Sequence, residues 1–320
     1  MWLAYYVHHL NPFLIRFNDQ FGIRWYGVAY LCGFVAAFYL LKWLARKGYG
    51  SLSEGQVADF TFYAALFGVL VGGRLGYVIF YRPEMLTTDP LGILRVWDGG
   101  MASHGGILGL LIFSWIYARR HKISWTGIGD NLVAVAPLGL LFGRIANFIN
   151  GELWGHPTHV PWAVQFPSEL LDNADQAQTA IDQCSALNPN LDSVAAIIDA
   201  ARTNPQVREI LSRILTPRHP SQLYEAGLEG ILLFTILAAM IRFGALKRPG
   251  LILGSFIMFY GLARITGEFF REPDPQLGFL WGGLTMGMLL SVPMVIAGAV
   301  LIVMAWRRNH PKQVPAEGRP

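Results

Sequence analysis

Long apolar stretches separated by short polar segments run through most of the chain. Seven of these stretches reach the length of about 20 residues that a helix needs to cross the hydrocarbon core of a bilayer. The pattern predicts an all-α, polytopic integral membrane protein with about seven transmembrane helices, in which 1–320 forms a single membrane-embedded domain. The predicted spans are Trp25–Leu44, Ala58–Tyr81, Gly100–Ala118, Ile128–Ile149, Leu223–Ile241, Leu251–Phe270 and Trp281–Trp306.

The composition supports this class and argues against a soluble protein. Hydrophobic residues make up 53% of the 320 residues and charged residues only 14%, with a mean hydropathy of +0.38. A soluble domain usually carries about 25% charged residues. The net charge of +4 does not indicate nucleic-acid binding, because the basic residues lie in short loops between the spans, as topology signals do.

Those basic residues also predict the orientation of the chain. They follow the first, third and fifth spans and continue into the tail with Arg308, Lys312 and Arg319. Because loops rich in lysine and arginine stay in the cytoplasm, we expect the N-terminus outside and the C-terminus in the cytoplasm. An odd number of spans agrees with termini on opposite sides.

The longest connection, 156–222 between spans four and five, faces outward in this topology. It is polar, but its 188–215 portion has the apolar spacing of helices. We therefore expect a small extracytoplasmic head of short helices. Its role stays open between an inert insertion and a rim that guides a substrate.

The end of the fourth span carries unusual polar residues for a membrane helix. The run Gly143–Gly155 follows the apolar Leu132–Phe142 and contains Arg144, Asn147 and Glu152. Each such group costs several kcal/mol in lipid unless it is paired, hydrogen-bonded or hydrated. A helix that bears this cost is more typical of an active cavity than of a plain anchor.

Three other spans carry polar residues at the same predicted depth. Tyr26 lies at the start of span one and His104 at the start of span three. Tyr260, Arg264 and Glu268 lie near the end of span six. The orientation puts all of them in the outer half of the membrane, together with the run at the end of span four. This convergence from separate parts of the sequence indicates one site.

Two arginines, Arg144 and Arg264, suit a phosphate group. A guanidinium stays charged and can bind two phosphate oxygens at once, so at the outer leaflet the pair favours a phospholipid headgroup as ligand. The alternative is an internal salt bridge, to Glu152 or Glu268, that only holds helices together. Arg264 and Glu268 have the i,i+4 spacing of a pair on one helix face.

Other residues of this set also have two interpretations. His104 suits a general base near neutral pH, or it is a structural histidine held by hydrogen bonds. Tyr26 and Tyr260 could be interfacial anchors, and Asn147 could cap the helix end. No motif indicates a metal site, and the two cysteines lack metal-ligand spacing.

Four motifs together resemble one protein family. They are His104-Gly105-Gly106, the Gly143–Gly155 run with its Asn-Phe-Ile-Asn-Gly-Glu-Leu-Trp-Gly, the His-Pro-Ser-Gln-Leu-Tyr-Glu of His219–Glu225, and Arg264–Arg271. With these motifs, nearly the whole chain is similar to bacterial prolipoprotein diacylglyceryl transferase.

The resemblance implies an activity that composition cannot reveal. Members of this family transfer the diacylglyceryl group of phosphatidylglycerol to the lipobox cysteine thiol of a preprolipoprotein, and glycerol phosphate leaves. The product is a thioether, and the step is the first of lipoprotein maturation. It takes place at the outer leaflet of the bacterial inner membrane and uses no metal, nucleotide or other cofactor. The implied partners are the lipid, the signal peptide and the bilayer, with no nucleic acid.

The resemblance also implies residues that bind the substrate. Arg144 is expected to bind phosphatidylglycerol, with Asn147 and Glu152 holding it in place. Tyr26 and Glu268 match further residues that are important in the family, and we expect them to help bind the substrate.

Four residues are expected to carry the chemistry: His104, Tyr260, Arg264 and Glu152. His104 is assigned as the provisional base and Tyr260 as a hydrogen-bonding partner. Arg264, with Arg144, is expected to stabilise the charge that develops on the departing phosphate. Whether His104 takes the thiol proton or only orients another group stays open.

Two other classes of function are weaker alternatives. A transporter or channel would be expected to show inverted repeats or broken helices in corresponding halves, and we find no internal repeat. Its charges would tend to lie at the midplane, whereas here they gather toward the outer face. A structural or assembly subunit leaves the two intramembrane arginines unexplained.

Overall fold

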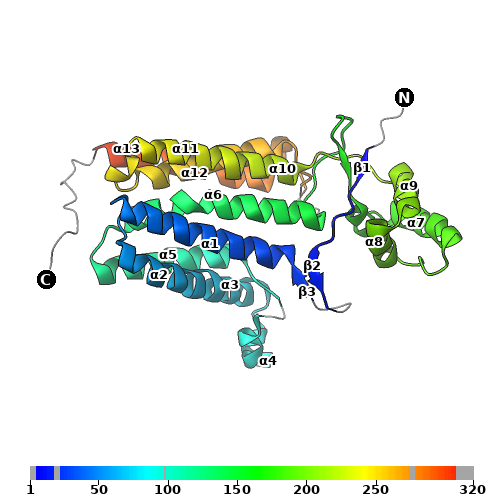
Figure 1. Cartoon of the computed structure of the whole chain (residues 1–320), viewed down its shortest axis with the longest axis horizontal. Coiled ribbons are helices and arrows are strands. Elements are labelled where there is room, and N and C mark those ends of the chain that lie inside the picture. The colour runs from blue at the N-terminus through cyan, green and yellow to red at the C-terminus, as the bar shows by residue number, and fades with distance from the viewer. Residues whose placement is uncertain (1–4, 18–21, 97–98, 274–277, 308–320) are drawn as a thin grey trace. The chain divides into compact units, whose positions relative to one another are not determined.

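Helices dominate the structure, a computed structural model that describes residues 5–17, 22–96, 99–273 and 278–307. The predicted all-α, polytopic fold is confirmed, because the described residues include only four short strands. In chain order (Figure 1) the elements are β1 (Tyr6–Val7), β2 (Phe13–Arg16), β3 (Gly22–Arg24), α1 (Trp25–Arg46), α2 (Glu54–Tyr63), η1 (Ala64–Val71), α3 (Gly72–Tyr81), α4 (Met85–Thr88), η2 (Pro90–Leu94), α5 (Ser103–His121), α6 (Trp125–Asn150), β4 (Val164–Gln165), η4 (Pro167–Leu171), α7 (Ala174–Leu187), α8 (Val194–Thr203), α9 (Pro205–Ile214), α10 (Ser221–Glu225), η5 (Ala226–Leu232), α11 (Leu233–Arg242), η6 (Ala245–Lys247), α12 (Leu251–Glu268), η7 (Trp281–Gly283) and α13 (Met286–Arg307).

Among the described residues, six unbroken stretches of helix are long and apolar enough to cross a membrane. They correspond to six of the seven predicted spans. The remaining predicted span coincides with α5, a 19-residue helix that has Ser103 and His104 in its first turn and ends in Arg119, Arg120 and His121. Because of these polar ends, α5 is not among the six stretches that are apolar enough to cross a membrane. Its crossing of the membrane stays a prediction. The six stretches are Trp25–Arg46, Glu54–Tyr81, Trp125–Asn150, Ser221–Arg242, Leu251–Glu268 and Met286–Arg307.

The last span is shorter than predicted. Its helix α13 begins at Met286 rather than at Trp281, and Trp281–Gly283 forms a separate short turn. Gly282 and Gly283 have φ angles of 74° and 77°, a left-handed conformation that glycine adopts without a Cβ clash. These two residues therefore cannot be part of the regular helix, which begins after them. The predicted tail residues Arg308, Lys312 and Arg319 lie outside the described residues.

The chain divides into two compact units, and their border falls within five of the long helices. The first unit contains Met1–Gly33, Pro137–Thr235 and Met258–Ile296. The second contains Phe34–Ala136, Ile236–Ile257 and Ala297–Pro320. The expectation of a single membrane-embedded domain over 1–320 stays a prediction.

Three short helices follow one another in the 156–222 connection, within the first unit. Asn173, Ser193 and Asn204 begin α7, α8 and α9, and each side chain accepts a hydrogen bond from a backbone N–H of the first turn. The three helices pack together (Figure 1) around an apolar core that includes Cys184 and Leu211. The extracytoplasmic location of this head stays a prediction.

The N-terminal segment pairs with the head. Tyr6 and Val7 of β1 lie beside Val164 and Gln165 of β4 in a parallel pair. This pairing places His8 next to the end of the fourth span, because the ring of His8 lies 5.4 Å from that of Phe148.

Small residues bring the helices of the first unit close together at the predicted site. A Cβ added to Gly230 in η5 would lie 2.8 Å from Cβ of Leu141 in α6, a separation that real Cβ atoms do not show. The helix that carries Glu229 therefore runs directly against the helix that carries Arg144. Gly261 of α12 approaches Ser291 of α13 in the same way, with 3.1 Å between an added Cβ and the Ser291 carbonyl oxygen.

In the second unit, glycines on η1, α3 and α5 allow a similar approach. A Cβ on Gly72 would lie 2.7 Å from the carbonyl oxygen of Gly105, and a Cβ on Gly76 would lie 2.5 Å from its Cα. Glycine pairs of this kind let helix backbones pack without side chains between them. The contact fixes the start of α5, where His104 lies, against α3.

Candidate active site

An arginine near the end of α6 forms ion pairs with two glutamates of another helix. Nη1 of Arg144 lies 3.0 Å from Oε2 of Glu225, and its Nε and Nη2 each lie 3.0 Å from Oε2 of Glu229. Glu225 and Glu229 are about one helical turn apart along α10 and η5, so both carboxylates lie on one face. Both are fully buried, whereas the Arg144 side chain keeps 14% of its surface exposed.

A second arginine, Arg264 of α12, reaches the same two carboxylates. Its Nη1 lies 2.7 Å from Oε1 of Glu225 and 3.7 Å from Oε1 of Glu229. Its Nη2 contacts Glu268, one turn further along α12, and Glu268 also accepts a hydrogen bond from Oγ1 of Thr285. The predicted pairing of Arg264 with Glu268 is confirmed.

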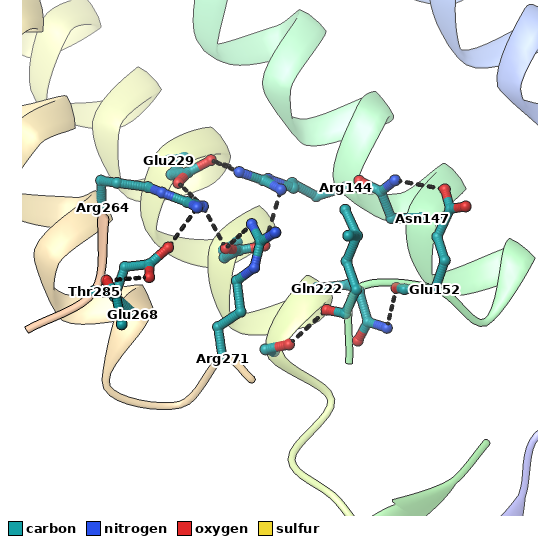
Figure 2. Close-up of polar contacts among 12 residues, drawn as sticks. Arg144, Asn147, Glu152, Gln222, Glu229, Arg264, Glu268, Arg271 and Thr285 are labelled. Atoms are coloured by element: carbon teal, nitrogen blue, oxygen red, sulfur yellow. Dashed lines mark hydrogen bonds and ion pairs between the residues drawn. The ribbon is translucent and has the colours of Figure 1, made fainter. Parts of the chain in front are cut away.

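A third arginine completes the group. Nη1 of Arg271, three residues beyond the end of α12, lies 3.8 Å from Oε1 of Glu225. Tyr260 interacts electrostatically with the charged side chains of the same group. Figure 2 shows Arg144 and Arg264 on opposite sides of Glu229. We call the following six residues the arginine–glutamate cluster: Arg144, Arg264, Arg271, Glu225, Glu229 and Glu268.

The formal charges of the arginine–glutamate cluster cancel, since three guanidinium groups meet three carboxylates. Burial of an ion is unfavourable unless close partners of opposite charge compensate it. Loss of one partner from a buried pair typically costs about 3–5 kcal/mol, because the other charge stays buried and unpaired. The cluster is therefore held together as a unit, and its members depend on one another.

A second polar group lies further along α6. Nδ2 of Asn147 donates to Oη of Tyr26 at 2.5 Å and to Oε1 of Glu152 at 2.8 Å. Nδ2 of Asn150 also lies 3.5 Å from Oε1 of Glu152. Asn147 follows Arg144 by about one turn, so the helix presents the charged cluster and this amide group on neighbouring positions. We call Tyr26, Asn147 and Glu152 the amide group.

The segment that carries Glu225 also holds the backbone at Glu152 and Leu153. Nε2 of Gln222 donates to the backbone oxygen of Glu152 at 2.6 Å, as Figure 2 shows. Oγ of Ser221 donates to the backbone oxygen of Leu153 at 2.9 Å. The turn here is tight, because Gly151 and Leu153 have φ angles of 70° and 57°. Two motifs that are 70 residues apart in the sequence thus form one site.

A separate arginine, Arg218, connects the head to this turn. Its Nε and Nη2 lie 3.1 and 2.7 Å from Oε1 of Glu169. Its Nη1 lies 3.0 Å from Oε2 of Glu272 and 3.2 Å from the backbone oxygen of Gly155. Its guanidinium also lies over the ring of Trp154, 4.1 Å from the centroid.

Comparison with known proteins identifies the family. A family model described as prolipoprotein diacylglyceryl transferase matches residues 12–304. The match includes every residue of the arginine–glutamate cluster and of the amide group. The chain belongs to the prolipoprotein diacylglyceryl transferase family.

Relatives of similar length agree with this membership. The chain is 48% identical to a phosphatidylglycerol–prolipoprotein diacylglyceryl transferase of Bradyrhizobium diazoefficiens, over 92% of each chain. It is 45% identical to the enzyme of that name from Rhodopseudomonas palustris, over 94% of this chain and 91% of the relative. The protein of that name from Nitrobacter winogradskyi is 46% identical over 90% of this chain and 86% of the relative. As a member of this family, the chain is an enzyme, a diacylglyceryl transferase.

Seven of the eight predicted site residues of this transferase lie in its first unit. Arg144, Arg264 and Glu268 belong to the arginine–glutamate cluster, with Tyr260 beside them. The other three, Tyr26, Asn147 and Glu152, form the amide group.

The partners of Arg144 differ from the prediction. We expected Asn147 and Glu152 to hold it in place, or Glu152 to form a salt bridge with it. In the structure its carboxylate partners are Glu225 and Glu229, and Glu152 instead accepts from Asn147. The physical reason is the close approach of η5 to α6, which brings fully buried carboxylates against the guanidinium.

Sequence reasoning gave no role to three members of the cluster: Glu225, Glu229 and Arg271. A signal for two of them was present, because Glu225 and Glu229 are acidic residues at i,i+4 in or beside an otherwise apolar span. Ionisable residues within transmembrane helices are rare and usually functional. The position of Arg271 beside Glu225 depends on how the chain turns after α12, which the sequence pattern did not reveal.

His104, the eighth predicted residue, belongs to the second unit. It is exposed in the first turn of α5. The segment before it is held by Arg74, which donates to the backbone oxygens of Ile93 at 2.9 Å and of Gly100 at 3.0 Å. The Ala102 N–H also donates to the backbone oxygen of Gly73 at 2.9 Å. The local position of His104 is thus fixed within its own unit, and its role as the base stays a prediction.

The described residues contain no group of three or more His, Cys, Asp or Glu side chains arranged to hold a metal ion.

Proposed function

We propose that this chain transfers the diacylglyceryl group of phosphatidylglycerol to the lipobox cysteine thiol of a preprolipoprotein. Its relatives are named for both the lipid and the prolipoprotein, which supports this pair of substrates. The observation that carries the proposal is the arginine–glutamate cluster. Two arginines with partly exposed side chains, Arg144 and Arg264, come from different membrane helices and share buried carboxylates. Guanidinium groups suit the recognition of a phosphate headgroup.

The proposed reaction is a substitution at carbon. The cysteine sulfur attacks the glyceryl carbon that bears the phosphate, and a carbon–sulfur bond forms as the carbon–oxygen bond breaks. The bonding electron pair leaves with glycerol phosphate. The thiol proton must be removed, because the thiolate is the nucleophile and a cysteine thiol ordinarily has a pKa of about 8.5.

Negative charge grows on the phosphate as the carbon–oxygen bond breaks. Donors that are already positioned for this charge can stabilise the transition state strongly. We assign this role to Arg264 and the binding of the phosphate to Arg144. Glu268 holds Arg264 from the same helix face, with Thr285 as a further hydrogen-bond partner of that carboxylate.

The amide group suits the glycerol end of the headgroup. It presents a phenol, an amide and a carboxylate within hydrogen-bonding distance of one another. Tyr26 and Asn147 offer donors and acceptors to the glycerol hydroxyl groups, and Glu152 can accept hydrogen bonds from those hydroxyl groups. We assign Tyr26 and Asn147 to binding, and Glu152 to the orientation of the lipid during the reaction.

We retain His104 as the proposed base for the thiol proton and Tyr260 as a hydrogen-bonding partner in the site. The test is the dependence of kcat/KM on pH for the wild type and for His104→Asn. Because a base must be unprotonated to accept the thiol proton, the wild-type rate should fall at acidic pH. In the variant, the rate should be lower by about 100-fold or more and should lack this acidic limb. An unchanged acidic limb in the variant removes His104 as the base.

The proposed location is the bacterial inner membrane, with the N-terminus outside and the site toward the outer leaflet. Arginines in the last turns of α1, α11 and α13 support a cytoplasmic side at those helix ends. Labelling of single cysteines introduced at the two termini in intact cells tests this orientation. A C-terminal cysteine that reacts with a membrane-impermeant reagent contradicts it.

The direct test of the function is a transfer assay with the purified protein. Phosphatidylglycerol labelled in its acyl chains is mixed with a lipobox peptide, and the peptide is analysed for thioether-linked diacylglycerol. The wild type should modify the cysteine peptide and leave a matched peptide with serine in place of cysteine unmodified. A wild-type preparation that binds both substrates but forms no thioether overturns the proposal.

A further inference from the structure

We propose that Glu225 and Glu229 form a buried carboxylate layer that positions the arginines and cancels their charge, so that the phosphate product can leave. The proposal rests on the transfer reaction proposed above. It assigns Glu225 and Glu229 as positioning residues, because they act through the arginines and are themselves inaccessible.

The cluster has two layers that differ in exposure. The side chains of Glu225 and Glu229 have no exposed surface, whereas Arg144 and Arg264 keep 14% and 16% of theirs. The arginine side chains are therefore the more accessible part of these ion pairs. The carboxylates lie beneath them, in contact with the arginines.

Arg144 is paired with the buried carboxylates without using all of its N–H donors. Nη1 of Arg144 lies 3.0 Å from Oε2 of Glu225, yet this buried oxygen receives no hydrogen bond from the described residues. The N–H groups of that Nη1 are therefore not aimed at Glu225. Because each Nη of a guanidinium carries two N–H groups, Arg144 can bind a phosphate oxygen while it stays paired with both glutamates.

Glu225 has the wider contacts of the two. Its carboxylate lies within ion-pairing distance of Arg144 from α6, of Arg264 from α12 and of Arg271 beyond α12. One buried acid thus attracts three guanidinium groups that come from separate segments. Glu229 takes the other side of Arg144 through both Nε and Nη2.

The charge balance matters because the product is more anionic than the substrate. A phosphodiester headgroup carries one negative charge, whereas a phosphate monoester carries about 1.5 to 2 at pH 7. Three arginines without carboxylates would attract the product more strongly than the substrate. With Glu225, Glu229 and Glu268 the cluster is formally neutral, and this preference for the product is reduced.

The experiment compares kcat with inhibition by added glycerol phosphate in the transfer assay. Glu225→Gln keeps the shape but adds one net positive charge to the cluster. We expect its inhibition constant for glycerol phosphate to fall by about tenfold, because a buried positive charge is no longer compensated. Its kcat should also fall, since the amide cannot hold three guanidinium groups as a carboxylate does.

Glu225→Asp separates charge from geometry. It keeps the negative charge but shortens the side chain by one methylene. The inhibition constant should stay within about twofold of wild type, while kcat falls because the arginines shift. An inhibition constant that falls equally in the Asp and Gln variants contradicts the charge-cancelling role.

The matched control is Glu169→Gln, which also neutralises a buried glutamate that is paired with an arginine, but in the head. It should lower stability without changing the inhibition constant for glycerol phosphate. Glu229→Gln provides a second test, because it makes the same charge change in the layer if Glu225→Gln does not fold. It should also lower the inhibition constant.

Unchanged inhibition in a folded, active Glu225→Gln or Glu229→Gln overturns this proposal and leaves the proposed reaction intact. A wild-type enzyme that forms no thioether overturns the proposed reaction itself. The two failures are therefore distinguishable in one assay.

Discussion

Two buried arginine–glutamate groups of the first unit use the same chemistry in different ways. In the head, all three nitrogens of the Arg218 guanidinium are hydrogen-bonded, to Glu169, Glu272 and the Gly155 backbone, and its face lies over an aromatic ring. In the arginine–glutamate cluster, Arg144 is paired with two carboxylates, but its Nη1 is not aligned with Glu225. The first arrangement gives every nitrogen of its guanidinium a hydrogen bond, whereas the second leaves the Nη1 of Arg144 without a hydrogen bond to Glu225.

The difference shows that burial of an ion pair does not by itself reveal its role. Both groups satisfy the requirement that buried charges be compensated. They differ in whether every nitrogen of the guanidinium group has a hydrogen bond. A buried pair with complete hydrogen bonds fixes the fold, whereas a buried pair with donors left over can also bind an anion.

The largest expected effect comes from Arg264→Lys. Lysine keeps the charge but cannot contact Glu225 and Glu268 through two nitrogens of one planar group. We expect thioether formation to fall by about 100-fold or more, the size of effect seen when one donor to a developing anion is lost. The measurement is the initial rate of peptide modification at saturating phosphatidylglycerol. Near-wild-type turnover would contradict the role of Arg264 in stabilising the charge on the departing phosphate.

Arg218→Met should lower the stability of the protein and leave its turnover almost unchanged. The buried carboxylate of Glu169 loses the guanidinium that lies 2.7 Å away, and the free energy of unfolding should fall by about 3 kcal/mol. Turnover per folded molecule should stay within about twofold of wild type. Thermal unfolding in detergent and the transfer assay on the same preparation measure the two effects. A large loss of turnover with unchanged stability would show that Arg218 belongs to the active site.

His8 offers a smaller, pH-dependent test of the contact between the head and α6. Its backbone N–H donates to Gln165 at 2.8 Å, and its ring packs on Phe148 and Phe166. Burial lowers the pKa of His8 from 6.5 to about 4. As the pH falls below 6.5, the unfolded chain takes up a proton that the folded chain does not, and stability is lost down to about pH 4.

Between pH 7 and pH 5 this linkage should lower the free energy of unfolding by about 2 kcal/mol. His8→Phe keeps an aromatic ring at the position and should remove that part of the acid sensitivity. Denaturant unfolding of the two proteins at both pH values measures the difference. An equal loss in the variant would place the acid sensitivity elsewhere.

The sequence could predict the elements and most of the residues of the site, but not how they pair. The i,i+4 spacing predicted the contact of Arg264 with Glu268, because it lies within one helix. The partners of Arg144 lie 81 and 85 residues away along the chain, and their contact depends on the packing of η5 against α6. Periodicity within a helix contains no information on such a distant neighbour.

Other differences have local physical causes. The seventh span was predicted too long, because its apolar pattern begins at Trp281. The left-handed φ angles of Gly282 and Gly283 are not helical, and the helix begins only at Met286. The assignment of Arg144 to Glu152 followed from closeness in sequence. In the structure the tight turn at Gly151 directs Glu152 toward Asn147 instead.

We propose that Arg144 binds the phosphate of phosphatidylglycerol, whereas the similarly buried Arg218 stabilises the fold. The most direct measurement is the dissociation constant for labelled phosphatidylglycerol in neutral detergent micelles, for wild type, Arg144→Met and Arg218→Met. Arg144→Met should raise the constant by about tenfold or more, equivalent to about 1.4 kcal/mol, while Arg218→Met leaves it unchanged. Equal binding by the wild type and Arg144→Met would contradict the phosphate-binding role of Arg144.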